Sequence, residues 1–218
     1  MAMKSEDSNL FEEEVSSTMN LPKSVFDSES EKTPKPCILV IFGASGDLTG
    51  KKLIPALYNL MEGGLLPANF VCVGFARRPK THDEFRKEML DHIKKHSRST
   101  SDDKGLEMFT EKLFYFQSNF DDDEGYKNLH TFLENLDTKY GTMGNRVFYL
   151  SVQPTYFSPI TAKLKQHDFI YEEGDKAHFS RVIIEKPYGT DLSSALELQS
   201  SMMHNLSENQ IYRIDHYL

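Results

Sequence analysis

The chain has 218 residues, a formal net charge of -8 and 39% hydrophobic residues. This length and hydrophobic content suit one α/β domain with a tail. The chain contains no apolar run of roughly 18 residues, the length that a membrane-spanning helix needs, so we expect no membrane partner. No basic stripe offsets the acidic charge, which argues against nucleic acid as a partner.

The two cysteines, Cys37 and Cys72, each lie inside an apolar run typical of a strand. Thiols in such runs are usually buried and behave as small hydrophobic groups. We therefore predict two reduced thiols and no disulfide framework. This cysteine usage favours a reducing compartment, and we expect a cytoplasmic protein.

Residues 1–35 differ in composition from the rest, because they are rich in Glu, Asp and Ser with only scattered apolar residues. A secretory signal needs a basic start and an apolar middle, and transit peptides avoid acidic residues. Neither pattern fits. We predict an acidic, disordered tail over 1–35 and an NADP-binding domain over 36–218. A docked helix around Leu10–Val15 is the alternative for the tail.

Strands and helices alternate along the rest of the chain. An unbroken apolar run ending at Phe42 predicts a buried parallel strand, because helices cover both faces of such a strand. After a glycine turn, helical spacing of apolar residues predicts a helix that ends at Gly63. The apolar positions of this helix are Leu53, Leu57, Leu60 and Met61. Further strands are predicted at 70–75, 112–117, 146–150, 181–185 and 210–214, and further helices at 81–96, 124–136, 157–164 and 192–203. The polar stretch 97–105 predicts a loop.

This alternation indicates an α/β fold, a doubly wound parallel sheet of the Rossmann-like kind with right-handed crossovers. Ligands of such sheets bind beyond the carboxyl ends of the strands. The residues that directly follow each strand are therefore the candidates for a functional site.

A glycine turn separates the first strand from the first helix. Such a turn presents backbone N–H groups and the positive end of the helix dipole, which suit a phosphate or pyrophosphate. The pattern lacks the third glycine of the dinucleotide fingerprint. A P-loop does not fit, because three residues separate Gly46 from Gly50 and Lys52 follows Lys51. A tight turn without a ligand remains the alternative. The candidate cofactor-binding residues are Gly43, Ala44, Ser45, Gly46, Asp47 and Leu48.

Arg77 and Arg78 follow the second strand. A carboxylate at this position would bind the ribose 2′-hydroxyl of NAD and repel a 2′-phosphate, whereas the arginine fork suits phosphate oxygens. Arg77 therefore predicts NADP as the cofactor. A solvated basic turn before Pro79 is the alternative.

Lys186 precedes Pro187 at the end of a strand, where an X-Pro bond can be cis and fix a sharp turn. Its ammonium group could hold a hydroxyl or a phosphate, although an ordinary surface lysine remains possible. At the last strand, Asp215 and His216 are adjacent, and adjacent residues of an extended segment point to opposite faces. We therefore predict that His216 and Tyr217 contact a ligand rather than form a dyad with Asp215.

His92 and His96 stand four residues apart on a predicted helix and could share a metal ion. The sequence offers no evident third ligand, and zinc sites use three or four protein ligands. We predict no metal site.

Six segments, in order along the chain, resemble glucose-6-phosphate dehydrogenase, and the resemblance covers residues 36–218. They are Gly43–Leu48, Gly64–Pro67, Gly74–Arg77, Asn145–Leu150, Glu185–Gly189 and Ile211–Leu218. The resemblance implies NADP-dependent oxidation of glucose 6-phosphate at C1 to a lactone, the first step of the pentose phosphate pathway. It also implies that the glycine turn and Arg77 bind NADP, that Lys186 lies between cofactor and sugar, and that His216 and Tyr217 hold the sugar phosphate.

The chain departs from the family at its end. In the family, the phosphate-binding segment continues past the position of Leu218, and a C-terminal α+β domain supplies the general base and the subunit interface of a homo-oligomer. We find no substitute for that base, which must reach the C1 hydroxyl. We therefore name no catalytic residue and expect the 218 residues alone to be inactive. The alternative function is a catalytically silent dinucleotide-binding fragment or interaction domain.

Overall fold

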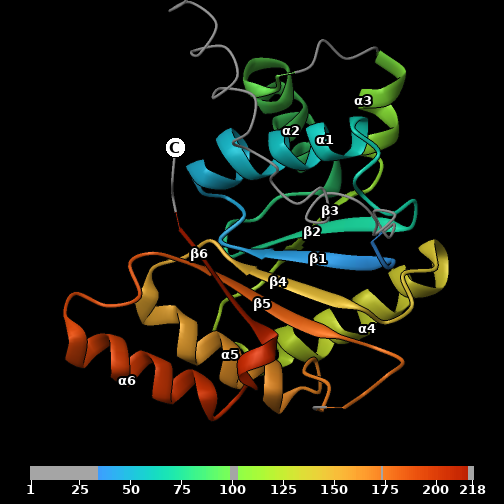
Figure 1. Cartoon of the computed structure of the whole chain (residues 1–218). Helices are drawn as coiled ribbons and strands as arrows, with labels where there is room; N and C mark the ends of the chain where they lie inside the picture. Colours follow the sequence, from blue (N-terminus) through green and yellow to red (C-terminus); the bar gives the residue numbers. More distant parts are fainter. Residues whose placement is uncertain (1–33, 99–102, 173, 216–218) are drawn as a thin grey trace, which may run out of the picture. The chain divides into compact units, whose positions relative to one another are not determined.

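The computed structural model of the chain describes residues 34–98, 103–172 and 174–215 (Figure 1). Almost all of the predicted tail over 1–35 lies outside these residues, so the predicted domain boundary stays a prediction. Within the described ranges, no helix combines the length and the apolar character that crossing a membrane requires.

The centre of the fold is a parallel sheet of six strands in the order β3-β2-β1-β4-β5-β6. Every neighbouring pair is parallel. This order, with consecutive strands wound outward in two directions from β1, confirms the predicted doubly wound, Rossmann-like sheet. The strands are β1 (Cys37–Phe42), β2 (Phe70–Ala76), β3 (Leu113–Gln117), β4 (Arg146–Leu150), β5 (Ser180–Glu185) and β6 (Ile211–Ile214).

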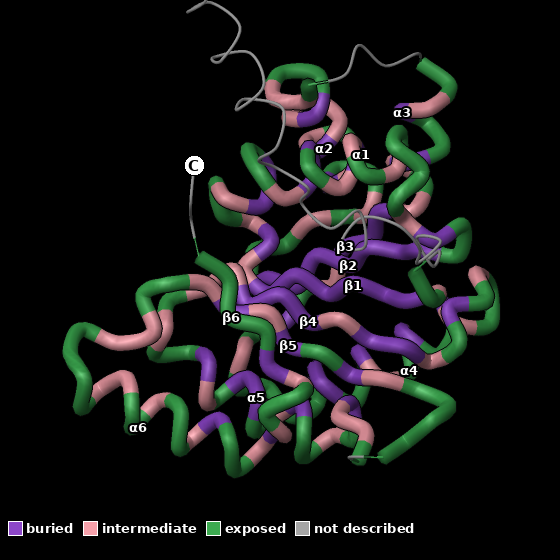
Figure 2. The backbone as a smooth tube through the Cα atoms, in the orientation of Figure 1, coloured by how far each residue is buried: buried purple, intermediate pink, exposed green. Residues whose placement is uncertain are grey.

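Helices cover both faces of the sheet, in two groups of three (Figure 1). The first group consists of α1 (Ile54–Glu62), α2 (His82–His96) and α3 (Asp103–Thr110), and the second of α4 (Asp123–Tyr140), α5 (Phe157–Gln166) and α6 (Leu192–Met203). A π-helical turn, Thr49–Leu53, leads into α1. This division explains the apolar run of β1, because all six of its residues are buried between the two layers (Figure 2).

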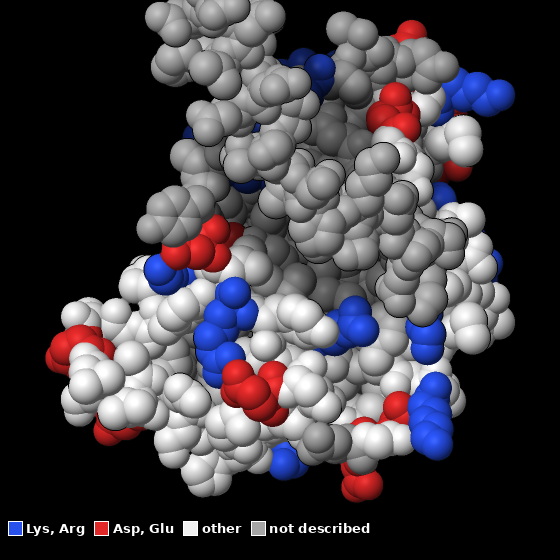
Figure 3. Space-filling view, in the orientation of Figure 1, with Lys and Arg blue, Asp and Glu red and all other residues white. Residues whose placement is uncertain are grey.

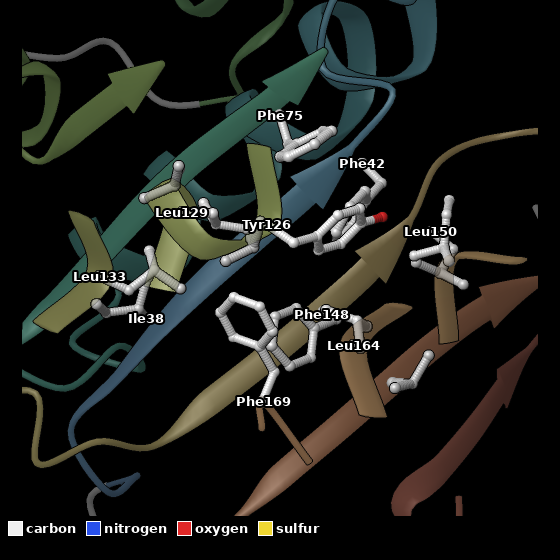
Figure 4. Packing of buried hydrophobic residues seen from close by; sticks show 14 of the residues in the cluster. Ile38, Phe42, Phe75, Tyr126, Leu129, Leu133, Phe148, Leu150, Leu164 and Phe169 are labelled. Carbon is white, nitrogen blue, oxygen red and sulfur yellow. The ribbon is translucent and has the colours of Figure 1, made fainter. Parts of the chain in front are cut away.

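The core between the sheet and α4 is rich in aromatic rings. The Phe42 and Phe75 rings, from adjacent strands, have centroids 4.7 Å apart, and Tyr126 of α4 lies 5.8 Å from Phe75 (Figure 4). Offset and tilted ring pairs at these separations add to the stabilisation from apolar burial. Phe42 and Phe75 are the last and next-to-last residues of their strands, so this packing fixes the edge of the sheet from which the glycine turn leaves.

Two sequence expectations need correction. The predicted loop over 97–105 is wrong at its end, since α3 begins at Asp103 and buries Leu106 and Phe109. In α1, the fully buried side chains are Ile54 and Tyr58, whereas Leu60, which the helical spacing had selected, is 39% exposed. The reason is the helical period, because Leu60 stands two residues after Tyr58 and therefore lies on nearly the opposite side of the helix.

Buried polar residues hold the amino edge of the sheet. Asn145, which precedes β4, donates from Nδ2 to the Pro36 carbonyl (2.8 Å) and accepts from the Phe179 amide (3.0 Å). These bonds join the starts of β1, β4 and β5. Arg146 is only 5% exposed, and its guanidinium donates to the Asp137 carboxylate (2.8 Å). The pairing satisfies a charge that would be costly to bury alone.

Candidate functional site

A cleft of about 460 Å³ opens at the carboxyl edge of the sheet, beside the ends of β1, β4 and β5. The chain leaves β1 toward one face and β4 toward the other, and the carboxyl edge at such a switch point is where α/β sheets bind ligands. Three turns that are far apart in the sequence meet here. The lining residues are Gly46, Asp47, Leu48, Leu150, Ser151, Val152, Gln153, Pro154, Phe157, Glu185, Lys186 and Pro187.

Gly43 brings the glycine turn against the loop after β4. Its φ of +84° lies in the left-handed region, and a Cβ placed on it would lie 2.2 Å from the Ser151 carbonyl oxygen. Its amide and that of Ala44 donate to the Phe75 carbonyl, at 2.9 and 3.2 Å. The first glycine of the turn therefore serves the backbone, because only a residue without a side chain permits this approach.

Gly46 has a different role. A Cβ at this position would meet one neighbour within 4 Å, the Gly43 carbonyl oxygen at 3.1 Å, and the residue lines the cleft. The amides of Asp47 and Leu48 follow it in the first helical turn, where no preceding helical carbonyl can accept from them. Such amides are a common site for phosphate groups. The turn thus combines backbone donors with room for an anion, so its residues fit a dinucleotide pyrophosphate.

The carboxylate of the glycine turn is paired. Asp47 accepts a hydrogen bond from Lys51 Nζ at 2.6 Å, one helical turn later. This bond holds the pKa of the Asp47 carboxyl below its usual value. The Lys51 cation therefore compensates a negative charge that would otherwise oppose an anionic ligand in the cleft.

Arg77 and Arg78 stand at the carboxyl end of β2, exposed and outside the cleft. The Arg78 carbonyl accepts from the Tyr115 hydroxyl (2.6 Å), which anchors the turn on β3. Neither guanidinium forms an ion pair with a residue that the structure describes. On the face shown in Figure 3, Lys and Arg side chains are interspersed with Asp and Glu side chains. Arg77 is thus placed on a fixed turn, without an ion pair to any of the described residues.

Lys186 lies in the cleft directly after β5, and the bond between it and Pro187 is cis. Its ammonium group donates to Asp215 at 2.5 Å, and this bond raises the pKa of Lys186. The cleft therefore brings the second half of the predicted glycine turn, Gly46 to Leu48, together with the predicted lysine, whereas Gly43, Ala44 and Ser45 are not among its lining residues. His216 and Tyr217 lie outside the described residues, so their predicted contact with a ligand stays a prediction.

The sequence interpretation missed one pair at this site. Glu185 lines the cleft, and its carboxylate accepts a hydrogen bond from the Tyr149 hydroxyl. The two residues are far apart in the sequence, and their pairing depends on β4 lying beside β5. The signal that could have found Glu185 is its place as the last residue of a buried strand, directly before Lys186.

His92 and His96 stack on α2 with ring centroids 5.8 Å apart. Among the described residues, no group of three or more His, Cys, Asp or Glu side chains is placed to hold a metal ion.

Comparison with known proteins identifies the family. Residues 40–218 match the family model described as "Glucose-6-phosphate dehydrogenase, NAD binding domain". The chain belongs to the glucose-6-phosphate dehydrogenase family. Within it, the chain corresponds to the dinucleotide-binding domain, which agrees with the Rossmann-like sheet and with the glycine turn at its carboxyl edge.

The relatives are longer than this chain. It is 54% identical over 185 residues to glucose-6-phosphate 1-dehydrogenase of Chlamydia muridarum. These aligned residues make up 84% of this chain and 36% of the relative. The Chlamydia pneumoniae enzyme is 53% identical over 190 residues, which make up 87% of this chain and 37% of that enzyme. The chain thus spans somewhat more than a third of the length of these relatives.

Solved structures agree with this assignment. A glucose-6-phosphate dehydrogenase in complex with its substrate glucose-6-phosphate superposes with a TM-score of 0.75 at 34% identity, over 85% of this chain and 37% of that one. The Mycobacterium avium enzyme superposes with a TM-score of 0.68 at 30% identity, over 83% of this chain and 36% of that enzyme.

Proposed function

We propose that the chain is the NADP-binding part of an enzyme that oxidises glucose 6-phosphate at C1. The observation that carries this proposal is the cleft, which brings the glycine turn and Lys186 together in a chain of this family. A dinucleotide-binding domain with a cation beside the cofactor cleft suits a dehydrogenase whose substrate carries hydroxyl and phosphate groups.

NADP fits the residues better than NAD. The pyrophosphate would bind at the turn that runs from Gly43 to Leu48, where Gly46 leaves room for it. Arg77, at the end of β2, would hold the 2′-phosphate, because a guanidinium attracts the charge that a carboxylate would repel. When bound, NADP supplies the chemistry of hydride acceptance. The protein's part is to bind it, orient it and place the sugar beside it.

Glucose 6-phosphate is the proposed substrate. A relative of 34% identity has been solved in complex with glucose-6-phosphate as its substrate. In this chain Lys186 would hold a sugar hydroxyl from the cleft, and His216 and Tyr217 would hold the sugar phosphate. The pairing of Lys186 with Asp215 keeps the ammonium group protonated, so that it donates hydrogen bonds and does not accept a proton.

The carboxylates at the cleft are poor candidates for the general base. Asp47 is bonded to Lys51, Asp215 to Lys186 and Glu185 to the Tyr149 hydroxyl. Each of these carboxylates already has a hydrogen-bond partner, whereas a general base needs an oxygen that can reach the C1 hydroxyl proton. We propose that the 218 residues bind the dinucleotide without turnover.

We also propose that the protein functions in the cytoplasm. Cys37 and Cys72 are both buried and free, and burial raises the pKa of the Cys37 thiol to about 11. A reducing compartment suits such thiols.

The test is a calorimetric titration of the 218-residue polypeptide with NADP and with NAD. Replacing Arg77 by alanine should weaken NADP binding about tenfold or more, because charged hydrogen bonds to phosphate contribute roughly 1.5–3 kcal/mol. Binding of NAD should not change. Arg98→Ala removes an exposed arginine that follows α2 by two residues, and it serves as the control. Equal affinity for NAD and NADP, or an equal loss for both, would contradict the role of Arg77.

Turnover is measured in the same preparation. Addition of glucose 6-phosphate with NADP should produce no rise in NADPH absorbance. A measurable rise would mean that a residue of this chain acts as the base.

A further inference from the structure

We propose that Glu185, held by Tyr149, is the carboxylate that receives the nicotinamide end of the dinucleotide and favours its oxidised, cationic form. The inference rests on the proposed function, because it requires that a nicotinamide dinucleotide binds in the cleft. It adds a positioning pair to that site, with Glu185 contacting the ligand and Tyr149 acting through Glu185.

The position of Glu185 is set by the sheet. It is the last residue of β5, and the register pairs Leu150 of β4 with Ile184 of β5. Glu185 therefore lies at the level of Ser151, where β4 ends and its loop begins to line the cleft. Because both strands end here, Glu185 stands at the carboxyl edge and is one of the residues that line the cleft.

Tyr149 fixes this carboxylate. The tyrosine is 8% exposed, and its ring packs in the core between the sheet and the layer of α1 and α2. Its hydroxyl donates to Glu185 Oε1. Burial, together with the hydrogen bond to Glu185, raises the pKa of the Tyr149 phenol, so the phenol keeps its proton and remains a donor. A rigid, buried donor restricts the rotamers of the glutamate that it bonds.

The order of strands decides which half of the ligand lies near Glu185. The pyrophosphate site is the turn after β1, and Arg77 after β2 marks the adenosine side. The strands on the other side of β1 are β4 and β5. A dinucleotide that lies along this edge therefore extends its nicotinamide half over the ends of β4 and β5, where Glu185 stands.

A carboxylate suits that half in two ways. It accepts hydrogen bonds, and the nicotinamide carboxamide offers an NH₂ group. The oxidised ring also carries a positive charge that the reduced ring lacks. A negative group nearby stabilises the oxidised form more than the reduced form, because opposite charges attract strongly where water is partly excluded.

The purely structural interpretation is that the Tyr149–Glu185 bond only joins β4 to β5. The two interpretations differ in their dependence on the ligand. A structural bond would affect every ligand of the cleft alike. A nicotinamide contact would affect only ligands that carry the ring, and would separate NADP⁺ from NADPH.

The experiment compares three ligands by calorimetry on the 218-residue polypeptide: NADP⁺, NADPH and 2′-phospho-ADP-ribose, which lacks the nicotinamide. We expect Glu185→Gln to weaken NADP⁺ about tenfold, the size of one charge-assisted contact, and NADPH by a smaller factor. The affinity for 2′-phospho-ADP-ribose should stay unchanged. Tyr149→Phe, which removes only the hydroxyl, should give the same order of effects at smaller size.

Glu134→Gln on α4 is the matched control, because it makes the same chemical change on an exposed helix and should alter none of the three affinities. Thermal melting verifies that each variant is folded, and Tyr149→Phe alone decides the result if Glu185→Gln does not fold. Equal weakening of all three ligands, or no weakening, overturns the inference. If the unmodified chain binds none of the three, the proposed function fails as well, and the two failures are thereby distinguished.

Discussion

Replacing Gly43 by alanine should lower the free energy of unfolding far more than replacing Gly46 by alanine, although both glycines belong to the same turn. A left-handed φ of +84° costs a residue with a Cβ about 1–2 kcal/mol. The added methyl would also lie 2.2 Å from the Ser151 carbonyl oxygen, a backbone atom that cannot rotate away. Forcing the two turns apart should cost a further 1–3 kcal/mol or so, as overpacking does. The sum, about 2–5 kcal/mol, is a large part of the roughly 5–15 kcal/mol of a typical domain.

Urea unfolding followed by circular dichroism measures this difference. For a slope of about 2 kcal/mol/M, the midpoint should fall by roughly 1–2.5 M for Gly43→Ala. Gly46→Ala is the matched control, because its Cβ would meet only the Gly43 carbonyl oxygen, at 3.1 Å, so we expect a loss under about 1 kcal/mol. Its dinucleotide affinity should nevertheless fall, since the methyl enters the cleft. A stable Gly43→Ala protein, or equal losses for the two variants, would refute this account of the turn.

Two further predictions concern the helices. The hydrogen bond from Lys163, with a second from His167, lowers the pKa of Asp123 from 3.8 to about 2. A lowered carboxyl pKa stabilises the fold at pH values above the pKa of the unfolded chain, and this stabilisation is lost as the pH falls through the folded value. The difference in Tm between the unmodified protein and Asp123→Asn should therefore shrink between about pH 4 and pH 2. A difference in melting scans that stays constant over this range would contradict the prediction. At the π-helical turn, a Cβ on Gly50 would lie 2.6 Å from the His92 ring, so Gly50→Ala should destabilise by about 1–3 kcal/mol. Adding His92→Ala should recover part of that loss in urea unfolding, and independent, additive losses would argue against the contact.

The sheet could be predicted from the sequence because its central strands β1 and β2 are buried on both faces. The β1 run of six apolar residues and the exact bounds of β4 follow from this burial. The carboxyl-edge rule then placed the glycine turn and Lys186 at one site, and the structure brings them together in the cleft. Arg77 was predicted at the same edge and lies there, at the end of β2, although outside the cleft.

What could not be predicted depends on contacts through space. Leu106 and Phe109 are too few to mark α3, and they are buried only because α1 and α2 lie beside them. The buried face of α1 is the side of Ile54 and Tyr58, and the Tyr58 ring is buried against Phe109 of α3, a contact that the spacing of the leucines does not reveal. Glu185 resembles any charged strand end until β4 places the Tyr149 hydroxyl against it.

The polar bonds of Asn145 and Arg146 at the amino edge bear on how variants of this protein should be interpreted. Asn145 fixes the starts of three strands, β1, β4 and β5, relative to one another. The cleft is built from the other ends of the same strands, which lie roughly 17 Å from their starts because a strand rises about 3.3 Å per residue. A change at Asn145 would therefore displace the turn after β1, the loop after β4 and Lys186 against each other without touching a ligand. In a screen scored on cofactor binding, such a substitution would resemble the loss of a binding residue. Only a comparison of stability with affinity would reveal that the alignment of the strands, and not a ligand contact, had been lost.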